Sequence, residues 1–544
     1  MFKKLLAGCL ALAMCAGMAG CKPESGTSTA SGSGSGEGGG KSLEKYETPL
    51  EVSIGMYKAA GNWDMADNEF TKFAKDVLNI QVKAEWELGY EAHVERVKLA
   101  ISTKSLPDMM LVHDYTLVMQ MARAGMLEDL TPAKDYFGDF MKEAYASFDG
   151  DACLKDVTID GKLYALPSTG IRGNQNILWL RKDWLDNVGL SVPTTVEEVY
   201  KVAEAFVKND PDRNGKKDTI GLPFNRWVWG NDNVHGSLDP VFAAYGAFPR
   251  RYYKDDSGQI YYGSIQPEMK NALSKVAEQV RAGNINPNTT GANEIAAGKC
   301  GMLFGTWWEP QGWLKTSREK DGNAEWIAVN APLNSDGKYV INDAAPTLEQ
   351  SGYVVVRKGF ANPEAAVKLV NLYYDGLYGN DDESWPWELY TGTTEPIPSF
   401  SSAPLGIQLG TRDVVYENYV KYKEWVDSDD HSGLSEAERK SVDAILRWQD
   451  DPASVSVDEW ADAVSKFEGS RLMKAPEVTY KVPAVFYLPS EFAQTIKSLR
   501  DYEDNVFFSI IAEEGISIDS FDEYVTQWKS IGGDQILDYL NENA

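Results

Sequence analysis

The chain has 544 residues, 43% of them hydrophobic, and a formal net charge of −28. This length exceeds what one hydrophobic core usually supports, so the sequence predicts two domains. An acidic chain repels nucleic acid and anionic lipid surfaces, which excludes both as binding partners of the folded part.

The N-terminus has the layout of a secretory signal. Two lysines precede an apolar run over residues 5–20, which is shorter than the roughly twenty residues that a membrane-spanning helix needs. The run ends in Met18-Ala-Gly-Cys21, which resembles the lipobox of bacterial lipoproteins, where the cysteine becomes the lipid-modified first residue of the mature chain. We expect residues 1–20 to be a signal peptide and Cys21 to carry a lipid such as palmitate, which anchors the protein to the outer face of the cytoplasmic membrane. The alternative is an ordinary cleavage site with a chance cysteine.

A flexible tether follows the signal. Residues 22–41 are almost all Gly, Ser, Thr and Ala, and such a composition cannot bury apolar area and behaves as coil. A coil of this length reaches roughly 25 Å. We therefore expect residues 21–45, the lipidated cysteine and the tether, to hold a globular head just off the membrane.

The beginning of the head predicts an α/β architecture. Alternating and helical apolar spacings predict a strand at 50–57, a helix at 68–78, a strand at 80–86, a helix at 91–103 and a buried strand at 106–112. This β-α-β-α-β order is typical of a parallel sheet, whose loop ends form ligand sites. The loops that contain Trp63 and the pair His113 and Asp114 should therefore lie at one sheet edge.

Several blocks of sequence share their order along the chain with a known family. They are Gly161-Lys-Leu-Tyr-Ala-Leu-Pro167, the stretch from Leu178-Trp-Leu-Arg-Lys-Asp-Trp to Pro193-Thr-Thr-Val-Glu-Glu, Ala296-Ala-Gly-Lys-Cys-Gly-Met-Leu-Phe-Gly-Thr-Trp-Trp308, Ser351-Gly-Tyr-Val-Val-Val-Arg, and Asn362-Pro-Glu-Ala-Ala-Val-Lys-Leu-Val-Asn. Together they resemble the family 1 extracellular solute-binding proteins. The stretch from Phe521 to Leu537 is similar to the long lipoprotein branch of Gram-positive bacteria.

This resemblance implies a two-lobe α/β fold, the type II periplasmic-binding-protein-like fold. The ligand would be trapped in a cleft between two lobes that crossover hinge strands join, and a closing hinge motion would capture it. The expected N-lobe comprises residues 46–167 and 331–410, and the expected C-lobe comprises residues 168–330 and 411–544. The resemblance also implies an ABC importer whose permease subunits receive the solute from a monomeric head.

The tryptophans indicate that the solute is an oligosaccharide or another sugar. The chain has 16 of them, and an indole face packs well against the C–H face of a pyranose ring. Those at apolar helix or strand positions, Trp179, Trp184, Trp448 and Trp528, are expected in the core. The candidates for ligand contact are Trp63, Trp227, Trp229, Trp307 and Trp308. The last two are favoured because the matching segment of the family ends at the cleft, and a peptide or amino-sugar ligand stays open.

Four polar residues complete the expected ligand site. Arg172, just past the first crossover, could form paired hydrogen bonds with sugar hydroxyls or with the carboxylate of a uronic acid. It could equally be a surface residue. His113, Asp114 and Glu349 are candidates because of their positions in loops.

A segment near residue 210 follows the pattern of a calcium-binding loop. The donors are Asp210, Asp212 and Asn214 at positions 1, 3 and 5 of an EF-hand loop, the Lys216 carbonyl at 7 and Asp218 at 9, with Gly215 at the turn. The glutamate of position 12 is missing, because Gly221 stands there. The segment resembles the calcium loops of alginate-binding members of the family, except that Thr219 replaces an acid. We expect a structural Ca²⁺, and the alternative is a plain turn.

Catalytic patterns are absent from the sequence. It contains no His-Glu-x-x-His, no Gly-x-Ser-x-Gly and no Cys/His cluster, and its four histidines are scattered. We therefore expect no enzyme activity and no organic cofactor. The alternatives are a sugar sensor that docks on a membrane histidine kinase and a carbohydrate-active hydrolase or lyase whose acids lie among the 81 acidic residues. Cys153 and Cys300 are expected to be unpaired.

Overall fold

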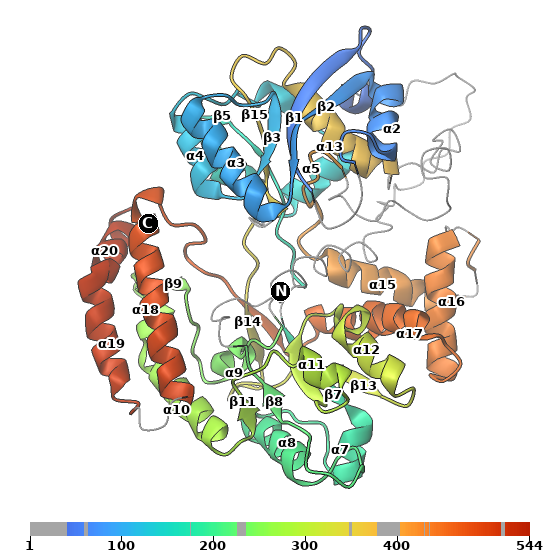
Figure 1. Ribbon diagram of the computed structural model, residues 1–544, viewed down its shortest axis with the longest axis vertical. Coiled ribbons are helices and arrows are strands. Elements are labelled where there is room, and N and C mark those ends of the chain that lie inside the picture. Colours follow the sequence, from blue (N-terminus) through green and yellow to red (C-terminus); the bar gives the residue numbers. More distant parts are fainter. Residues whose placement is uncertain are drawn as a thin grey trace. The chain divides into compact units, whose positions relative to one another are not determined.

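The computed structural model describes residues 41–543 except 59–63, 174–175, 226–234, 348–350, 378–402, 429, 433, 435 and 513–516. These residues form two compact units (Figure 1). Unit 1 comprises the described residues up to Ile171 together with those of Ala345–Val414, and unit 2 comprises those of Arg172–Ala344 together with those from Val415 onward. The chain therefore passes between the units three times, and each unit is assembled from two separate stretches.

The second crossing differs from the expectation. Residues 331–344, expected in the N-lobe, belong to unit 2. The reason is strand β14 (Tyr339–Asn342), which pairs in parallel with β16 (Val478–Lys481) of the same unit. The other crossings fall at 171/172 and 414/415, against 167/168 and 410/411 expected.

Unit 1 is built around a five-stranded sheet in the order β2-β1-β3-β15-β6. Its strands are β1 (Leu50–Tyr57), β2 (Ile80–Leu88), β3 (Met109–Val112), β15 (Tyr353–Val356) and β6 (Leu166–Pro167). β1 pairs in parallel with β2 and β3, whereas β15 runs antiparallel to β3 and β6. The first three strands, with α2 (Glu69–Leu78) and α3 (Tyr90–Thr103) between them, confirm the predicted β-α-β-α-β start.

Local capping explains where α2 begins and ends. The side chain of Asn68 accepts a hydrogen bond from the Thr71 amide, and the Thr71 hydroxyl accepts one from the Asn68 amide, both at 3.0 Å. The helix ends at Asn79, whose φ of 59° lies in the left-handed region that asparagine tolerates. The remaining elements of unit 1 are α4 (Tyr115–Arg123), α5 (Asp139–Ala146), α6 (Ala152–Asp156), β4 (Thr158–Ile159), β5 (Lys162–Leu163) and α13 (Glu364–Leu377).

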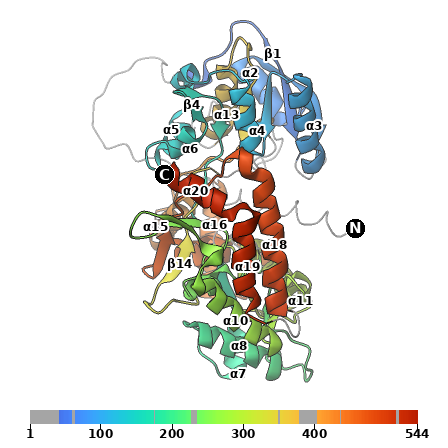
Figure 2. The ribbon, with the colours of Figure 1, turned by 90° about the vertical axis from the view of Figure 1, so that its left-hand side faces the viewer.

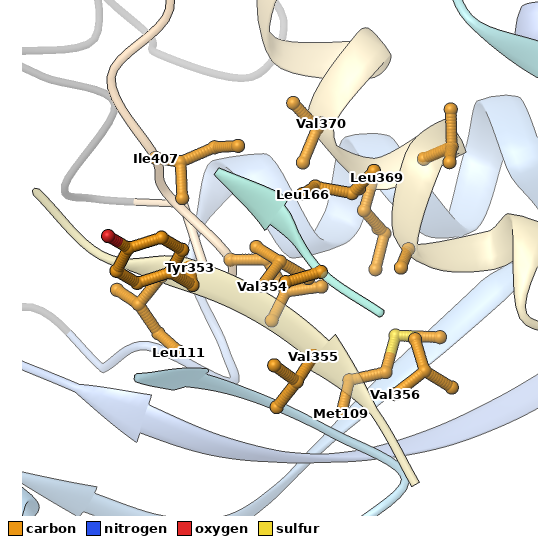
Figure 3. Close-up of a cluster of buried hydrophobic side chains, with 14 of the residues drawn as sticks. Met109, Leu111, Leu166, Tyr353, Val354, Val355, Val356, Leu369, Val370 and Ile407 are labelled. Carbon is orange, nitrogen blue, oxygen red and sulfur yellow. The ribbon is translucent and has the colours of Figure 1, made fainter. Parts of the chain in front are cut away.

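The core of unit 1 surrounds strand β15. Every residue of this strand is buried, as is typical of a strand in the interior of a sheet. Figure 3 shows its side chains among Leu111 and Leu166 of the neighbouring strands and Leu369 of α13. Full burial of such a side chain contributes roughly 1.5–3 kcal/mol to stability. An interior strand of this sheet therefore comes from the second stretch of the unit.

Unit 2 contains a three-stranded antiparallel sheet in the order β12-β7-β13. Its strands are β12 (Met302–Gly305), β7 (Ile177–Arg181) and β13 (Trp326–Val329). Two smaller pairs are β8 (Leu222–Pro223) with β11 (Ile285–Asn286) and β9 (Tyr252–Lys254) with β10 (Ile260–Tyr262). The helices are α7 (Lys182–Val188), α8 (Val196–Lys208), α9 (Asp239–Ala244), α10 (Pro267–Arg281), α11 (Ala292–Ala296), α12 (Trp313–Lys320), α15 (Val414–Asp427), α16 (Glu436–Asp450), α17 (Val457–Ala463), α18 (Ala493–Ala512), α19 (Ser520–Trp528) and α20 (Asp534–Glu542).

The C-terminal helices complete the core of unit 2. Helix α18 packs against α10 and α19 (Figures 1 and 2). Within this layer, the buried carboxylate of Glu503 pairs with Arg250 at 2.9 Å and accepts a hydrogen bond from Tyr524 at 2.7 Å. Trp179, Trp184 and Trp528 are buried, which confirms that they belong to the core, and Trp448 is partly buried against a smaller cluster.

Two further properties bear on location and redox chemistry. Among the described residues, none of the helices combines the length and the apolar character required to traverse a bilayer. Cys153 in unit 1 and Cys300 in unit 2 are buried free thiols. Burial raises the pKa of each thiol to about 12, so neither is a reactive thiolate at neutral pH.

Candidate functional site

Five of the predicted functional residues lie outside the described residues. They are Trp63, Trp227, Trp229 and Glu349, expected to contact the ligand, and Cys21, expected to carry the lipid. Of the remaining ligand candidates, unit 1 contains His113 and Asp114, and unit 2 contains the others.

An aromatic group lies where β1 and β3 of unit 1 end. Strand β1 ends at Tyr57, and His113 directly follows β3. The centroid of the His113 ring lies 5.2 Å from that of Tyr57 and 5.3 Å from that of Tyr90, and both contacts are edge-to-face. Tyr90, the first residue of α3, is 43% exposed. The aromatic group of unit 1, Tyr57, Tyr90 and His113, therefore presents ring surface at the sheet edge where the sequence predicts ligand contact.

His113 is uncharged in these surroundings. Burial, and to a lesser degree the neighbouring His93, lower the pKa of His113 to about 3. Behind it, His93 accepts the indole N–H of Trp86 on Nδ1 at 3.1 Å. The proton of His93 must then be on Nε2, which donates to the Leu111 carbonyl at 2.8 Å. Since a neutral imidazole does not attract a carboxylate, the aromatic group of unit 1 suits an uncharged ring better than an acidic one.

Asp114 has a structural role at the start of α4. Its Oδ1 accepts the backbone N–H of Leu117 at 3.2 Å. A carboxylate at this position satisfies an amide of the first helical turn that has no partner within the helix. One oxygen of Asp114 is therefore committed to the helix cap.

Arg172 is engaged by another residue of its own unit. Its Nε and Nη2 donate to the two carboxylate oxygens of Asp343, each at 2.7 Å. The guanidinium also lies 4.1 Å above the ring of Tyr480. The sequence suggests that the guanidinium of Arg172 binds sugar hydroxyls or a uronic acid. In the structure it binds the buried carboxylate of Asp343 instead, because the two residues meet beside the second crossing of the chain.

The tryptophan turn, Thr306–Glu309, follows β12 in unit 2. Trp307 and Trp308 are only 5% and 3% exposed, so neither indole presents an open face on which a sugar ring could stack. The indole of Trp179 donates to the Thr306 carbonyl at 2.9 Å. Gly469 lies so close that a Cβ there would be 2.3 Å from the Trp307 carbonyl oxygen. Contacts from two other segments therefore hold the turn in place.

The structure adds His235 and Glu309 to the residues of this turn. Nδ1 of His235 lies 2.6 Å from Oε2 of Glu309, and both side chains are buried. The imidazole packs against Trp313, with 4.5 Å between ring centroids, and edge-on to Trp308 at 5.2 Å. Burial alone would lower the pKa of His235, but the charge and the hydrogen bond of Glu309 raise it above its ordinary value.

The sequence carries a partial signal for this pair. Glu309 directly follows the two candidate tryptophans, and a carboxylate beside a predicted ligand platform is a reasonable candidate for binding hydroxyl groups. Nothing in the sequence joins it to His235, however, because 74 positions separate the two residues.

The predicted calcium loop connects α8 to β8 in unit 2. Asn214 lies at its centre: its side-chain nitrogen donates to Asp212 at 2.6 Å and to Asp218 at 3.1 Å, and its backbone N–H donates to Asp210 at 3.2 Å. Burial, and then the hydrogen bond and charges of the neighbouring carboxylates, raise the pKa of Asp212. Two carboxylates therefore accept from the side-chain amide of Asn214, and a third accepts from its backbone amide.

The donor set of this loop fits calcium, whereas the observed arrangement of the donors does not. Among the described residues, no group of three or more His, Cys, Asp or Glu side chains is placed to hold a metal ion. At the centre of the loop, the NH₂ group of Asn214 faces the carboxylates of Asp212 and Asp218, and its oxygen accepts the Lys216 amide at 2.7 Å. Rotation of this amide by half a turn would put its oxygen among the carboxylates.

Comparison with known families and curated proteins gives a consistent result. The family model described as bacterial extracellular solute-binding protein matches residues 62–375. The polygalacturonan/rhamnogalacturonan-binding protein YtcQ of Bacillus subtilis (strain 168) is 24% identical over 98% of this chain and 97% of its own length. Lipoprotein LipO of the same organism is 23% identical over 85% of this chain and 86% of its own length.

The fold also matches a solved structure. The ABC-transporter substrate-binding protein FusA of S. pneumoniae, an EF-hand mutant in complex with fructo-nystose, aligns with a TM-score of 0.60 at 16% sequence identity. The alignment covers 91% of this chain and 98% of the FusA chain. This likeness shows a shared α/β binding-protein fold, in agreement with the predicted fold class.

Proposed function

The chain belongs to the family of bacterial extracellular solute-binding proteins, and on that basis we propose that it captures an oligosaccharide outside the cell and hands it to the permease of an ABC importer. YtcQ, similar along nearly the whole chain, is named for two polysaccharides, and the FusA structure holds fructo-nystose. Both names support a carbohydrate as the solute. The chain would bind this solute without changing it chemically.

The observation that carries the sugar assignment is the aromatic surroundings of the candidate positions in each unit. Unit 1 has the group of Tyr57, Tyr90 and His113. Unit 2 has Trp307 and Trp308, whose indole N–H groups have no hydrogen-bond partner among the described residues. Aromatic faces pack against the C–H groups of a sugar ring, and free indole N–H groups donate to its hydroxyls.

A thermal-shift screen of residues 42–544 tests this function. The probes are kestose, galactotriose, trigalacturonate, mannotriose, trimannuronate and a tripeptide. A ligand at about one hundred times its dissociation constant adds about 2.7 kcal/mol to stability, which shifts the melting temperature visibly. We expect at least one sugar to give this shift and to be recovered intact by chromatography. A shift with the tripeptide alone would overturn the sugar assignment, and a cleaved sugar would indicate an enzyme.

We propose further that a lipid on Cys21 holds the mature chain at the outer face of the cytoplasmic membrane. The likeness to LipO, which is named a lipoprotein, supports this anchor. In cells that express the full chain, Cys21→Ser should move the protein from the membrane fraction to the culture medium. Unchanged fractionation of the variant would contradict the anchor.

We also propose that the loop from Asp210 to Asp218 binds a structural Ca²⁺. The ligands would be the carboxylates of Asp210, Asp212 and Asp218, the side-chain oxygen of Asn214 and the carbonyl of Lys216. The presence of an EF-hand in FusA, a protein of the same fold, supports this proposal. Calcium would neutralise the three carboxylates that now accept hydrogen bonds from the side chain and the backbone of Asn214.

A further inference from the structure

Buried polar atoms without hydrogen-bond partners gather at the tryptophan turn. Among the described residues, no partner exists for Oγ1 of Thr306, Nε1 of Trp307, Nε1 of Trp308 or Oε1 of Glu309. All four residues are at most 5% exposed. Buried polar groups in folded proteins nearly always have a partner, whether protein, water or ligand. These four atoms of the tryptophan turn therefore need hydrogen-bond partners from a molecule outside the described chain.

The chemistry of these four atoms matches a sugar hydroxyl. The two indole N–H groups only donate, the second oxygen of Glu309 only accepts, and the threonine hydroxyl does both. A sugar hydroxyl donates and accepts, so it can satisfy either kind of atom. The carboxylate of a uronic acid only accepts, and beside Glu309 it would place two like charges close together.

The position of the Glu309 carboxylate is narrowly determined. Its Oε2 is bound to His235 at 2.6 Å, and the same oxygen lies 2.4 Å from where a Cβ at residue 305 would stand, so the carboxylate fills the space that Gly305 leaves. Its Oε1 has no appreciable contact with solvent. Water therefore screens this charge poorly, and the charge acts on a ligand at the turn with or without a direct hydrogen bond.

The compensating positive charge at the turn is His235, which is already bound to Oε2 of Glu309, and the other described candidates add no further positive charge for a ligand carboxylate. The guanidinium of Arg172 is paired with both oxygens of Asp343. His113, in the aromatic group of unit 1, is neutral. His235 carries its proton toward Glu309 and contacts Trp308 and Trp313 with its ring.

We propose that Glu309 is a specificity-determining residue, which makes the tryptophan turn select an uncharged, hydroxyl-rich sugar ring over a uronic acid. The inference rests on the proposed function, because it requires a sugar at this turn. A preference for an uncharged sugar ring would distinguish this chain from YtcQ, whose name refers to polygalacturonan.

Two matched pairs of sugars test the proposal on the intact head. α-1,4-Linked galactotriose and trigalacturonate differ only in the C6 group, as do β-1,4-linked mannotriose and trimannuronate. We expect the neutral member to bind about tenfold more tightly or better in isothermal titration calorimetry, since like charges at a buried site disfavour the wrong ligand. In Glu309→Gln, which keeps the shape of the side chain, the ratio of the two affinities should fall toward one.

Two further variants separate charge from folding. Glu477→Gln removes a different partly buried carboxylate of unit 2, one that accepts from Asn330 at 3.0 Å, and should leave the ratio unchanged. His235→Gln removes the positive partner of Glu309 and should raise the ratio, because the carboxylate is then uncompensated. This second variant has the opposite sign to Glu309→Gln, so general loss of structure cannot imitate both results.

The outcomes distinguish this inference from the proposed function. A head that binds none of the sugars in the screen, kestose included, contradicts the proposed function and this inference with it. A head that binds sugars but prefers the uronic acid, or keeps the same ratio in Glu309→Gln, contradicts only the inference.

Discussion

The side chains of His235 and Glu309 meet in the interior of unit 2, where water is largely excluded. In such surroundings a charged pair is favourable only as a pair, and a single buried charge is strongly unfavourable. The pKa of His235 is raised above its ordinary value of 6.5. Its stabilising contribution is therefore complete below pH 6.5 and is lost as the pH rises through the raised pKa of the folded state.

The first prediction concerns this pair. His235→Gln should lower the free energy of unfolding by about 3 kcal/mol at low pH, because it removes one partner of a buried ion pair. The difference from the wild type should shrink as the pH rises, since the wild-type imidazole then loses its proton. Urea unfolding of both proteins between about pH 6 and pH 9 measures this difference. His431→Gln, at a ring that bonds the carbonyl of Trp425, is the control. A difference that is constant over the pH series would contradict the charged pair.

At the scale of the elements, the π-helical turn Val464–Gly469 after α17 contacts the tryptophan turn through Gly469. Gly469 is not among the glycines with a positive φ, so its backbone conformation is open to other residues. Glycine is needed at position 469 for a steric reason alone, because the Trp307 carbonyl lies where a side chain would be. The π-helical turn thus supports Trp307, a candidate for ligand contact, through its last residue, Gly469.

The second prediction follows from that contact. Alanine usually stabilises a helix relative to glycine by roughly 0.5–1 kcal/mol. Gly469→Ala should instead destabilise the protein by about 1–3 kcal/mol, because the new methyl group must displace backbone. Gly322→Ala, whose Cβ would meet nothing within 4 Å, is the matched control and should be nearly neutral. Thermal unfolding compares the two, and equal melting temperatures would show that the turn yields easily.

The third prediction concerns the loop between α8 and β8. Chelation of calcium with EDTA should lower the melting temperature of the wild type, and Asp212→Asn should abolish that effect. With EDTA present, the variant should be at least as stable as the wild type, because burial and neighbouring carboxylates already raise the pKa of Asp212. Asp186→Ala, which removes an exposed partner of Lys182, is the control. A wild type that does not respond to EDTA would leave the loop as a turn closed by Asn214.

At the scale of the whole molecule, the two units have separate cores but share one discontinuous chain. Unit 1 takes its interior strand β15 from residues after the second crossing, and this strand pairs with β3 on one side and β6 on the other. A strand that is buried on both sides stabilises the sheet far more than an edge strand, because its neighbours lose their partners without it. Neither unit is therefore a contiguous fragment that can be cut out.

The fourth prediction is that a chain truncated after Ala344 does not form unit 1. The fragment from residue 42 to residue 344 keeps β1, β2, β3 and β6 but loses β15 and α13. We expect little cooperative unfolding in a thermal melt and rapid cleavage by proteases. A matched fragment from residue 42 to 414 contains all strands of unit 1 and should protect that unit. Equal protection of unit 1 in both fragments would show that β15 is dispensable.

The sequence by itself determined the local elements and the polar side chains of the loop from Asp210 to Asp218. The alternation over residues 50–57 matches β1 to the residue, and the helical spacing from Asn68 matches α2 with its cap. These features depend on side-chain periodicity and on hydrogen bonds between near neighbours, so a short stretch of sequence is enough to predict them. The family resemblance, which rests on the order of such stretches, extended this to the fold and the class of function.

Only the tertiary structure decided which residues meet. Arg172 pairs with Asp343 across 171 positions, and His235 pairs with Glu309 across 74, so both guanidinium and imidazole have partners that no spacing could indicate. The assignment of residues 331–344 to unit 2 has the same origin, because β14 pairs with a strand that follows far later in the chain. Such contacts depend on how the whole chain packs. A charged side chain has many possible partners of opposite charge, and the sequence alone does not distinguish among them.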